Sequence, residues 1–242
     1  MKKIAIIGFG RFGELLADIL KNHGQVHIMS QSGHSGAFPL IGKQQLGEMD
    51  WVIPAVPISA LEQTLQDIAS ELKPDALVMD VCSVKVKPCE WLFKHVPAGV
   101  EIIGSHPMFG PDSAKNGLKG LQVVLCPLRA AESTVEEVRE VFRKLELKII
   151  ETSADEHDRQ AANCLAMVHF LGRGLDEMKL EKQEITTMGF ERLLAVNETV
   201  ANDTWQLFLD MQYYNPYAAV ARKALVSALE TVEAQILADK RE

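Results

Sequence analysis

The sequence has little of what several classes of protein require. Its 242 residues include four cysteines, and aromatic residues make up 6% of the chain. Acidic residues outnumber basic residues by 33 to 25, and the formal net charge of -8 leaves no basic surplus for a nucleic acid or an anionic membrane. No apolar run approaches the length of about 20 residues that a membrane helix needs. We therefore expect neither a nucleic-acid-binding protein nor a membrane protein.

Metal and disulfide patterns are also missing. The four cysteines are Cys82, Cys89, Cys126 and Cys164. Their spacing matches neither a set of metal ligands nor a disulfide framework, and no HExxH motif occurs. The first residues resemble a signal peptide, but their apolar run ends at Arg11 without a small-residue cleavage site. These absences predict a reduced, cytoplasmic protein without a metal site.

The first half of the chain alternates short β-branched runs with amphipathic stretches. The expected strands are 4–7, 26–29, 51–56, 76–81, 101–104, 121–126 and 147–152. Helical periods at 12–22, 61–72 and 134–145 lie between several of these strands. This alternation predicts an α/β fold with a doubly wound, mostly parallel sheet.

The second half has a different pattern. After Thr152 no strand signal occurs, and apolar residues recur at helical spacing in four segments, 160–178, 189–201, 204–211 and 218–237. We therefore predict a sheet domain at 1–152 and an all-helical domain at 153–242. Four or five helices of this size rarely bury so many apolar faces by themselves, so we expect a homodimer through the helical half.

The segment GFGRFG at 8–13 directly follows the first expected strand and precedes a helix. Gly8 permits a tight turn, Gly10 lets the backbone approach a pyrophosphate, and Gly13 lets helix and strand pack closely. The helix N-terminus adds the positive end of its dipole. The predicted dinucleotide contacts are Gly8, Phe9, Gly10, Arg11, Phe12 and Gly13. The alternative is a glycine-rich turn in an α/β domain that binds no nucleotide.

The end of the second expected strand lacks the Asp or Glu that NAD enzymes usually place there to bind the ribose 2′-hydroxyl. Ser30, Gln31 and Ser32 occupy this position, and His34 follows. No carboxylate repels a 2′-phosphate, and the hydroxyl groups can bind one. The pattern favours NADP over NAD, although the Arg that often holds the 2′-phosphate is also missing.

The octapeptide GSHPMFGP at 104–111 places a histidine between Ser105 and Pro107. Pro107 restricts the backbone beside His106, and the imidazole has a pKa close to working pH. This pattern favours a fixed proton acceptor. The alternative is an ordinary loop, because Gly and Pro are common in loops.

Four motifs together resemble the prephenate and arogenate dehydrogenases of tyrosine biosynthesis: GFGRFG, DVCSVK at 80–85, GSHPMFGP, and EHDRQAA at 156–162. The resemblance covers almost the whole chain, and the motifs occur in the family's order. In the helical half, QEITTMGFERLL, NETVANDTWQLF and YYNPYA are similar to plant-type arogenate dehydrogenases.

The resemblance implies a Rossmann-like fold and an NAD(P)-dependent oxidative decarboxylation of a cyclohexadienol. His106 would accept the proton of the ring hydroxyl, and Ser83 would bond the same hydroxyl or orient the imidazole and nicotinamide. Ser83 is also a good N-cap for a helix near Lys85. Lys85 itself could approach a substrate carboxylate or be solvated. Val56 and Pro57 would line the cofactor cleft, although Pro also simply ends strands.

The resemblance also places His157 and His169 near the substrate. The two histidines are 12 residues apart, and in one regular helix they lie within about 120° of each other at about 100° per residue. Without the resemblance, each would be interpreted as a structural histidine. The substrate contacts that the resemblance implies are Ser105, His106, Pro107, Met108, His157, His169, Arg192 and Asp203.

The chain departs from the bacterial prephenate-type enzymes at one position. Those enzymes hold a substrate carboxylate with an Arg five residues before an Asp, and alignment on Asp203 puts Glu198 at that place. Either Arg192 or Arg173 replaces this Arg, or the substrate is held differently. Asp203 itself would pair with the ammonium group of arogenate, where prephenate has a keto oxygen. The alternative role of Asp203 is the N-cap of the next helix.

The sequence therefore predicts an arogenate dehydrogenase, with prephenate dehydrogenase as the nearest alternative. A non-catalytic NAD(P)-binding regulatory protein is a third possibility, which the presence of Ser83 and His106 disfavours. A relative of the β-hydroxyacid dehydrogenases is disfavoured because no lysine lies between Ala162 and Leu171. We expect no appended regulatory or chorismate mutase domain, since the two halves use all the residues.

Overall fold

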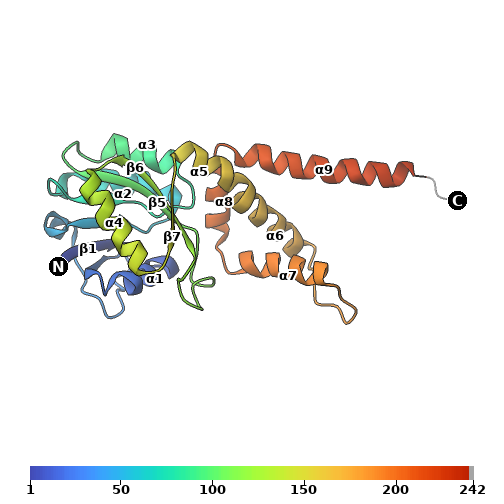
Figure 1. Ribbon diagram of the computed structural model, residues 1–242, viewed down its shortest axis with the longest axis horizontal. Coiled ribbons are helices and arrows are strands. Elements are labelled where there is room, and N and C mark those ends of the chain that lie inside the picture. Colours follow the sequence, from blue (N-terminus) through green and yellow to red (C-terminus); the bar gives the residue numbers. More distant parts are fainter. Residues whose placement is uncertain (240–242) are drawn as a thin grey trace. The chain divides into compact units, whose positions relative to one another are not determined.

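The computed structural model describes residues 1–239, and the chain divides into two compact units, Met1–His157 and Asp158–Glu242 (Figure 1). The boundary that the sequence suggested, between 152 and 153, lies just before helix α5 (Ala154–Ala161). The division in the structure falls within that helix.

The first unit contains a seven-stranded sheet. Its strands are β1 (Lys2–Ile7), β2 (Gly24–Met29), β3 (Trp51–Pro54), β4 (Leu77–Met79), β5 (Glu101–Pro107), β6 (Gln122–Arg129) and β7 (Lys148–Glu151). They are arranged in the order β2-β1-β3-β4-β5-β6-β7, and β6 runs antiparallel to β5 while the other neighbours are parallel. The predicted doubly wound, mostly parallel sheet is confirmed.

The direction of the crossovers decides which face each helix covers. From β1 the chain moves outward to β2 through α1 (Arg11–Leu20), whereas α2 (Ile58–Ile68) and α3 (Val86–His95) lead the other way, from β3 to β4 and β5. Right-handed crossovers in opposite directions place α1 on one face of the sheet and α2 and α3 on the other (Figure 1). The reversal between β1 and β3 is the place where open α/β sheets bind ligands, beyond the carboxyl ends of the strands.

The core of this unit lies between the sheet and its helices. Ile4, Ile6 and Ile53 are fully buried, because central parallel strands are covered on both faces and therefore read as continuous apolar runs. Leu16 of α1 and Phe142 of α4 (Glu132–Lys144) belong to the same core cluster, so these two helices cover one face together.

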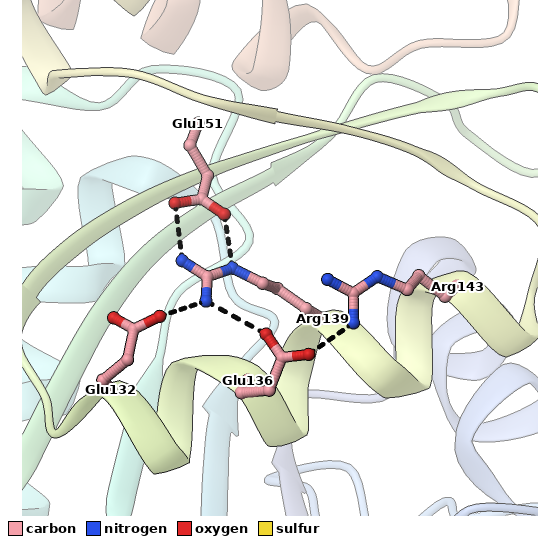
Figure 2. Close-up of polar contacts among 5 residues, drawn as sticks. All are labelled: Glu132, Glu136, Arg139, Arg143 and Glu151. Carbon is pink, nitrogen blue, oxygen red and sulfur yellow. Dashed lines mark hydrogen bonds and ion pairs between the residues drawn. The ribbon is translucent and has the colours of Figure 1, made fainter.

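The edge strand β7 is tied to α4 by a network of charged side chains (Figure 2). Arg139 of α4 donates from Nε and Nη2 to the two carboxylate oxygens of Glu151 on β7, at 2.5 and 2.9 Å. Its Nη1 also contacts Glu132 and Glu136, and Glu136 bonds Arg143 at 2.5 Å. The bidentate pair fixes the edge strand against the helix.

The octapeptide at 104–111 is not wholly a loop. Residues 104–107 belong to β5, which lies between β4 and β6, and His106 pairs in register with Val124. The irregular segment begins after Pro107, so the imidazole is held by a strand rather than by a Gly/Pro loop.

The second unit is helical, as the sequence predicted. Its helices are α6 (Met167–Glu177), α7 (Met188–Ala201), α8 (Trp205–Tyr214) and α9 (Ala218–Ala238). A π-helical turn, Ala162–Ala166, lies between α5 and α6. The assumption of one regular helix from His157 to His169 was wrong, because a π turn has more residues per turn than an α-helix and shifts the phase.

Packing within the second unit depends on close contacts and buried amides. A Cβ at Gly172 of α6 would lie 2.5 Å from Val200 Cγ2, so the glycine allows α6 and α7 to approach closely. Gln212 of α8 donates to the Ala166 carbonyl at 2.8 Å, which satisfies a backbone group near the π turn. None of the helices within residues 1–239 is both long and apolar enough to cross a membrane.

Candidate functional site

The glycine motif forms the turn between β1 and α1. Gly8 has φ +99°, and a Cβ there would lie 2.5 Å from the Ala55 carbonyl oxygen. A Cβ at Gly13 would lie 2.3 Å from the Gly8 carbonyl oxygen, so the turn and helix pack too closely for any side chain. Apart from Gly10 itself and its two chain neighbours, a Cβ at Gly10 would meet no atom of residues 1–239 within 4 Å. The turn is therefore closed by Gly8 and Gly13 and open at Gly10, which fits a dinucleotide pyrophosphate at the start of α1.

The segment after β2 is polar and exposed. Ser30 Oγ and Ser32 Oγ share a hydrogen bond of 2.9 Å, and the His34 backbone N–H donates to Ser32 Oγ at 3.3 Å. The His34 ring lies edge-on to Phe9 of the glycine motif, with ring centroids 5.4 Å apart. The structure thus places the hydroxyl-rich segment next to the glycine turn. The side chain of Gln31 is exposed.

Val56 and Pro57 follow β3, beside the glycine turn. A Cβ at Gly8 would lie 3.2 Å from Val56 Cγ1, which places Val56 next to this turn. Pro57 is exposed and is the N-cap residue of α2. Both residues thus lie beyond the carboxyl end of β3, at the switch point of the sheet.

Ser83 lies between β4 and α3. Its Oγ is buried, and within the described part of the chain it has no hydrogen-bond partner. The N-cap position of α3 belongs to Lys85, so Ser83 does not cap this helix as the alternative interpretation supposed. A buried hydroxyl without a partner is costly, which makes this group a candidate for a hydrogen bond to a ligand.

His106 and His157 form a buried pair at the end of the sheet. His106 is 5% exposed and His157 is 4% exposed. His106 Nδ1 lies 2.9 Å from His157 Nε2, and the rings meet at 67°. Sequence reasoning assigned His157 to the substrate, and the structure places it against the proposed base.

The surroundings of His106 keep its imidazole neutral. Burial lowers the pKa of His106 well below its ordinary value, and the neighbouring His157 and the Lys85 charge lower the pKa further. A neutral imidazole retains a lone pair for an incoming proton, which is the form that the predicted role of proton acceptor requires.

Two further predictions for this segment need revision. Ser105 is fully buried and donates its hydroxyl to the Asp80 carbonyl at 2.5 Å, so this hydroxyl does not face a substrate. Lys85 is neither solvated nor directed at a substrate carboxylate, because its side chain is fully buried against Asp80. Pro107 is buried within β5, and Met108 is half-buried just beyond it.

In the helical unit, His169 lies beside Asp203. His169 is 5% exposed, and its Nε2 is 3.7 Å from Asp203 Oδ2. Its Nδ1 is buried without a hydrogen-bond partner in the part of the chain that the structure describes. Burial lowers the pKa of His169, while the Asp203 carboxylate opposes this shift.

Thr204, rather than Asp203, is the N-cap of α8. The Thr204 hydroxyl accepts a hydrogen bond from the Leu207 backbone N–H at 3.1 Å. The capping role that the sequence allowed for Asp203 was therefore wrong. The Asp203 side chain keeps 30% of its surface exposed.

The two candidates for the missing carboxylate-binding Arg differ in their surroundings. Arg192 is exposed on α7. Arg173 bonds the Asp203 carbonyl and lies 5.7 Å from the centre of the Trp205 ring, and its Nε is buried with no hydrogen-bond partner among residues 1–239. Glu198 is exposed, 4.0 Å from Lys182. These surroundings favour Arg173 over Arg192 as the replacement for the missing carboxylate-binding Arg.

Asp80 is the buried residue that sequence reasoning passed over. It lies in the DVCSVK motif, and its carboxylate contacts Lys85 and two backbone N–H groups. The signal available in the sequence was an acid and a lysine at the two ends of one motif between a strand and a helix.

No group of three or more His, Cys, Asp or Glu side chains in residues 1–239 could hold a metal ion.

Comparison with known protein families shows to which family the chain belongs. A family model described as the nucleotide-binding domain of prephenate dehydrogenase matches residues 39–151, and a TYRAAT1-like C-terminal domain matches residues 174–242. Arogenate dehydrogenase 2, chloroplastic, of Arabidopsis thaliana is 32% identical, over 97% of this chain and 70% of the plant protein. The chain belongs to the prephenate and arogenate dehydrogenases.

Other members of the prephenate and arogenate dehydrogenases agree with this assignment. Arogenate dehydrogenase 1, chloroplastic, of the same plant is 30% identical, and the match covers 97% of this chain but 39% of that protein. Among solved structures, prephenate dehydrogenase from A. aeolicus in complex with hydroxyphenyl propionate and NAD+ has a TM-score of 0.78 at 18% identity, over 99% of this chain and 92% of that one. Synechocystis arogenate dehydrogenase has a TM-score of 0.71 at 20% identity, over 98% and 93%. At these identities the likeness shows the fold alone.

Proposed function

We propose that this protein oxidises arogenate to tyrosine, with loss of carbon dioxide and transfer of a hydride to NADP. The observation that carries the proposal is the buried, neutral His106, held on β5 by the strand and by His157. The buried Ser83 hydroxyl supports the same function, since it follows β4, the strand next to β5.

The proposed chemistry requires little of the protein beyond positioning and one proton acceptor. A bound nicotinamide dinucleotide supplies the acceptor for the hydride that leaves the ring carbon bearing the hydroxyl. His106 Nε2 accepts the hydroxyl proton as the carbon-oxygen double bond forms. The bond to the ring carboxylate then breaks, its electrons make the ring aromatic, and the oxygen regains a proton. Ser83 holds the same oxygen in line with His106.

The cofactor is NAD or NADP, and we propose that NADP is preferred. The turn at Gly8, Gly10 and Gly13 and the N-terminus of α1 would hold the pyrophosphate. Ser30 and Ser32 would hold the 2′-phosphate, because their hydroxyl groups lie together and are exposed.

The substrate preference follows from charge. We propose that Asp203 pairs with the ammonium group of arogenate and disfavours the keto acid prephenate. Asp203 is not needed as the cap of α8, and it lies beside His169. Arg173 supplies the cation that would bind a substrate carboxylate in place of the bacterial Arg.

We also propose a homodimer through the helical unit. The helix α9 exposes a series of large apolar residues: Val220, Val226, Leu229, Val232, Ile236 and Leu237. Several of them recur at intervals of three or four residues, which places them on one face of the helix. A contiguous apolar face of this kind is usually covered by a partner, and a second copy would bury it. The cytoplasmic location expected from the composition stays a prediction.

Initial rates on arogenate and on prephenate, each with NAD and with NADP, test the proposed function directly. We expect the highest kcat/KM with arogenate and NADP. A higher kcat/KM with prephenate would contradict the substrate proposal, and no turnover of either compound would contradict the function. Light scattering after gel filtration, on the protein and on Leu229→Glu, tests the dimer.

A further inference from the structure

Asp80 and Lys85 form an ion pair that is fully shielded from solvent. Asp80 follows β4, Lys85 precedes α3, and each side chain is 0% exposed. Although burial by itself would lower the pKa of Lys85, the Asp80 carboxylate raises it above its ordinary value, so the ammonium group stays charged. Burying two charges is expensive, and such a pair is weak evidence of a gain in stability. Its function must lie in the arrangement that it holds.

The pair reaches the backbone beside both proposed catalytic residues. Asp80 Oδ2 accepts a hydrogen bond from the Cys82 N–H at 3.0 Å, and Cys82 directly precedes Ser83. Asp80 Oδ1 accepts from the Ser105 N–H at 3.2 Å, and Ser105 directly precedes His106. One carboxylate therefore binds the chain next to Ser83 and the chain next to His106.

Lys85 and Ser105 complete the same connection. Lys85 Nζ donates to the Ser105 carbonyl at 2.6 Å, and the Ser105 hydroxyl donates to the Asp80 carbonyl at 2.5 Å. With its N–H, hydroxyl and carbonyl all bonded, Ser105 has little freedom to shift along β5. Gly104 makes room for this contact, since a Cβ there would lie 2.7 Å from Cys89 Sγ and 3.5 Å from Asp80 Oδ1.

We propose that Asp80 and Lys85 are positioning residues, which fix the Ser83 hydroxyl relative to the His106 imidazole by binding the backbone before each of them. The inference rests on the proposed function in that it takes His106 as the proton acceptor and Ser83 as its hydrogen-bonding partner on the substrate hydroxyl. Neither Asp80 nor Lys85 is assigned a contact with the reacting atoms, because the carboxylate and the ammonium group are bonded to each other and to backbone groups.

The kinetic test separates positioning from general stability. The double variant Asp80→Asn/Lys85→Met removes both charges and leaves no unpaired ion, so it is the variant most able to fold. We expect a normal KM for substrate and for NADP, and a kcat lowered by about 10²-fold, the size of effect that a misplacement of about 1 Å can produce. Lys87→Met is the matched control, because Lys87 is an exposed lysine on the same helix, paired with Glu90. It should keep wild-type kcat.

A second variant tests the positioning proposal if the double variant does not fold. Ser105→Ala removes one hydroxyl and one hydrogen bond from the connection and adds no volume. We expect it to fold, to keep its KM and to lose kcat by about tenfold, which corresponds to one lost hydrogen bond. Wild-type kcat in Ser105→Ala, or a kcat loss in the double variant matched by an equal loss of cofactor affinity, would overturn the proposal.

A measurement without turnover distinguishes a failure of this inference from a failure of the proposed function. The titratable groups that face His106 are His157 on α5 and Lys85, with Asp80 behind Lys85. Because the Lys85 charge lowers the pKa of His106, NMR titration of the His106 ring should show a higher pKa in Lys85→Met than in the wild type. This shift is expected whether or not the protein oxidises arogenate. An unchanged titration in a folded Lys85→Met variant would overturn the positioning through Lys85 and leave the proposed function untouched.

Discussion

His106 Nδ1 lies 2.9 Å from His157 Nε2, with both rings almost fully buried. Two neutral imidazoles can share this hydrogen bond if one nitrogen carries the proton and the other accepts it. When His106 Nδ1 is the donor, its Nε2 bears the lone pair that a general base needs. We propose that His157 is the acceptor and thereby holds His106 in the tautomer in which proton abstraction is possible, much as a carboxylate orients the histidine of a hydrolase.

The first prediction concerns the base itself. In His106→Asn the amide cannot accept the hydroxyl proton, so kcat should fall by about 10²- to 10⁴-fold. The proposed contacts with the pyrophosphate and the 2′-phosphate lie at the glycine turn and after β2 and do not include His106, so affinity for NADPH, measured by its fluorescence, should stay unchanged. Near-normal turnover in this variant would remove His106 from the catalytic role.

The second prediction concerns pH. The proposed mechanism requires neutral His106, so kcat/KM should fall as the pH drops through the pKa of this group. His157 is one of the causes that lower this pKa, and its removal in His157→Phe should raise the pKa. The acid limb of the profile of kcat/KM against pH should therefore move to higher pH, and kcat should fall because the tautomer is no longer selected.

The variant His157→Gln provides the comparison for this second prediction. The side-chain carbonyl of glutamine can still accept a hydrogen bond from His106 Nδ1, but it never becomes charged. We expect it to recover much of the kcat lost in His157→Phe. Equal loss in both variants would show that His157 acts through packing rather than through the hydrogen bond.

The sequence predicted those parts of the site that depend on local geometry. The turn at Gly8 and Gly13 is recognisable because a strand, a tight turn and a helix are adjacent in the chain. The environment of Lys85 was not predictable in this way. A lysine at the start of a helix is usually solvated, and it is buried here because β5, about 20 residues further along the chain, supplies the Ser105 carbonyl.

Two local predictions failed because close alternatives competed within the same segment. Asp203 and Thr204 are both good N-caps, and the residue that caps α8 is decided by where the helix begins. The regular helical spacing assumed between His157 and His169 was wrong because a π turn lies between them. The periodicity of apolar residues in the sequence does not indicate such a turn.

The third prediction concerns substrate selectivity. Asp203→Asn keeps the shape of the side chain and removes the charge that would pair with the ammonium group of arogenate. The ratio of kcat/KM for arogenate to that for prephenate should fall by about tenfold or more, equivalent to about 1.4 kcal/mol. Thr204→Ala is the matched control, because it removes the cap of α8 and leaves the carboxylate in place. If both variants change the ratio equally, the effect comes from the helix end and not from charge.

The fourth prediction concerns the choice of cofactor. Ser32→Asp introduces a carboxylate at the place where NAD enzymes usually have one, beside Ser30. A carboxylate should repel the 2′-phosphate, so KM for NADP should rise by about tenfold or more while KM for NAD falls or stays the same. Ser35→Asp, a few residues further along the same segment at a half-buried position, controls for general charge. An unchanged KM for NADP in Ser32→Asp would place the 2′-phosphate elsewhere.

The fifth prediction concerns the charged network between α4 and the edge strand β7 (Figure 2). The Arg139 side chain lowers the pKa of Glu151 in the folded protein below its ordinary value. The stabilisation from this pair is therefore present above the pKa of the unfolded chain, about 4.3, and is lost as the pH falls through the lower folded pKa.

Arg139→Met should accordingly lower the urea midpoint of unfolding at pH 7, and the difference from the wild type should shrink as the pH falls below about 4. Arg143→Met is the control within the same network, because Arg143 contacts Glu136 on its own helix and its side chain is 55% exposed. It should have the smaller effect, since a pair within one helix does not hold β7. A loss in Arg139→Met that stays constant from pH 7 to pH 3 would mean that the methylene groups of Arg139, rather than its charge, stabilise the edge of the sheet.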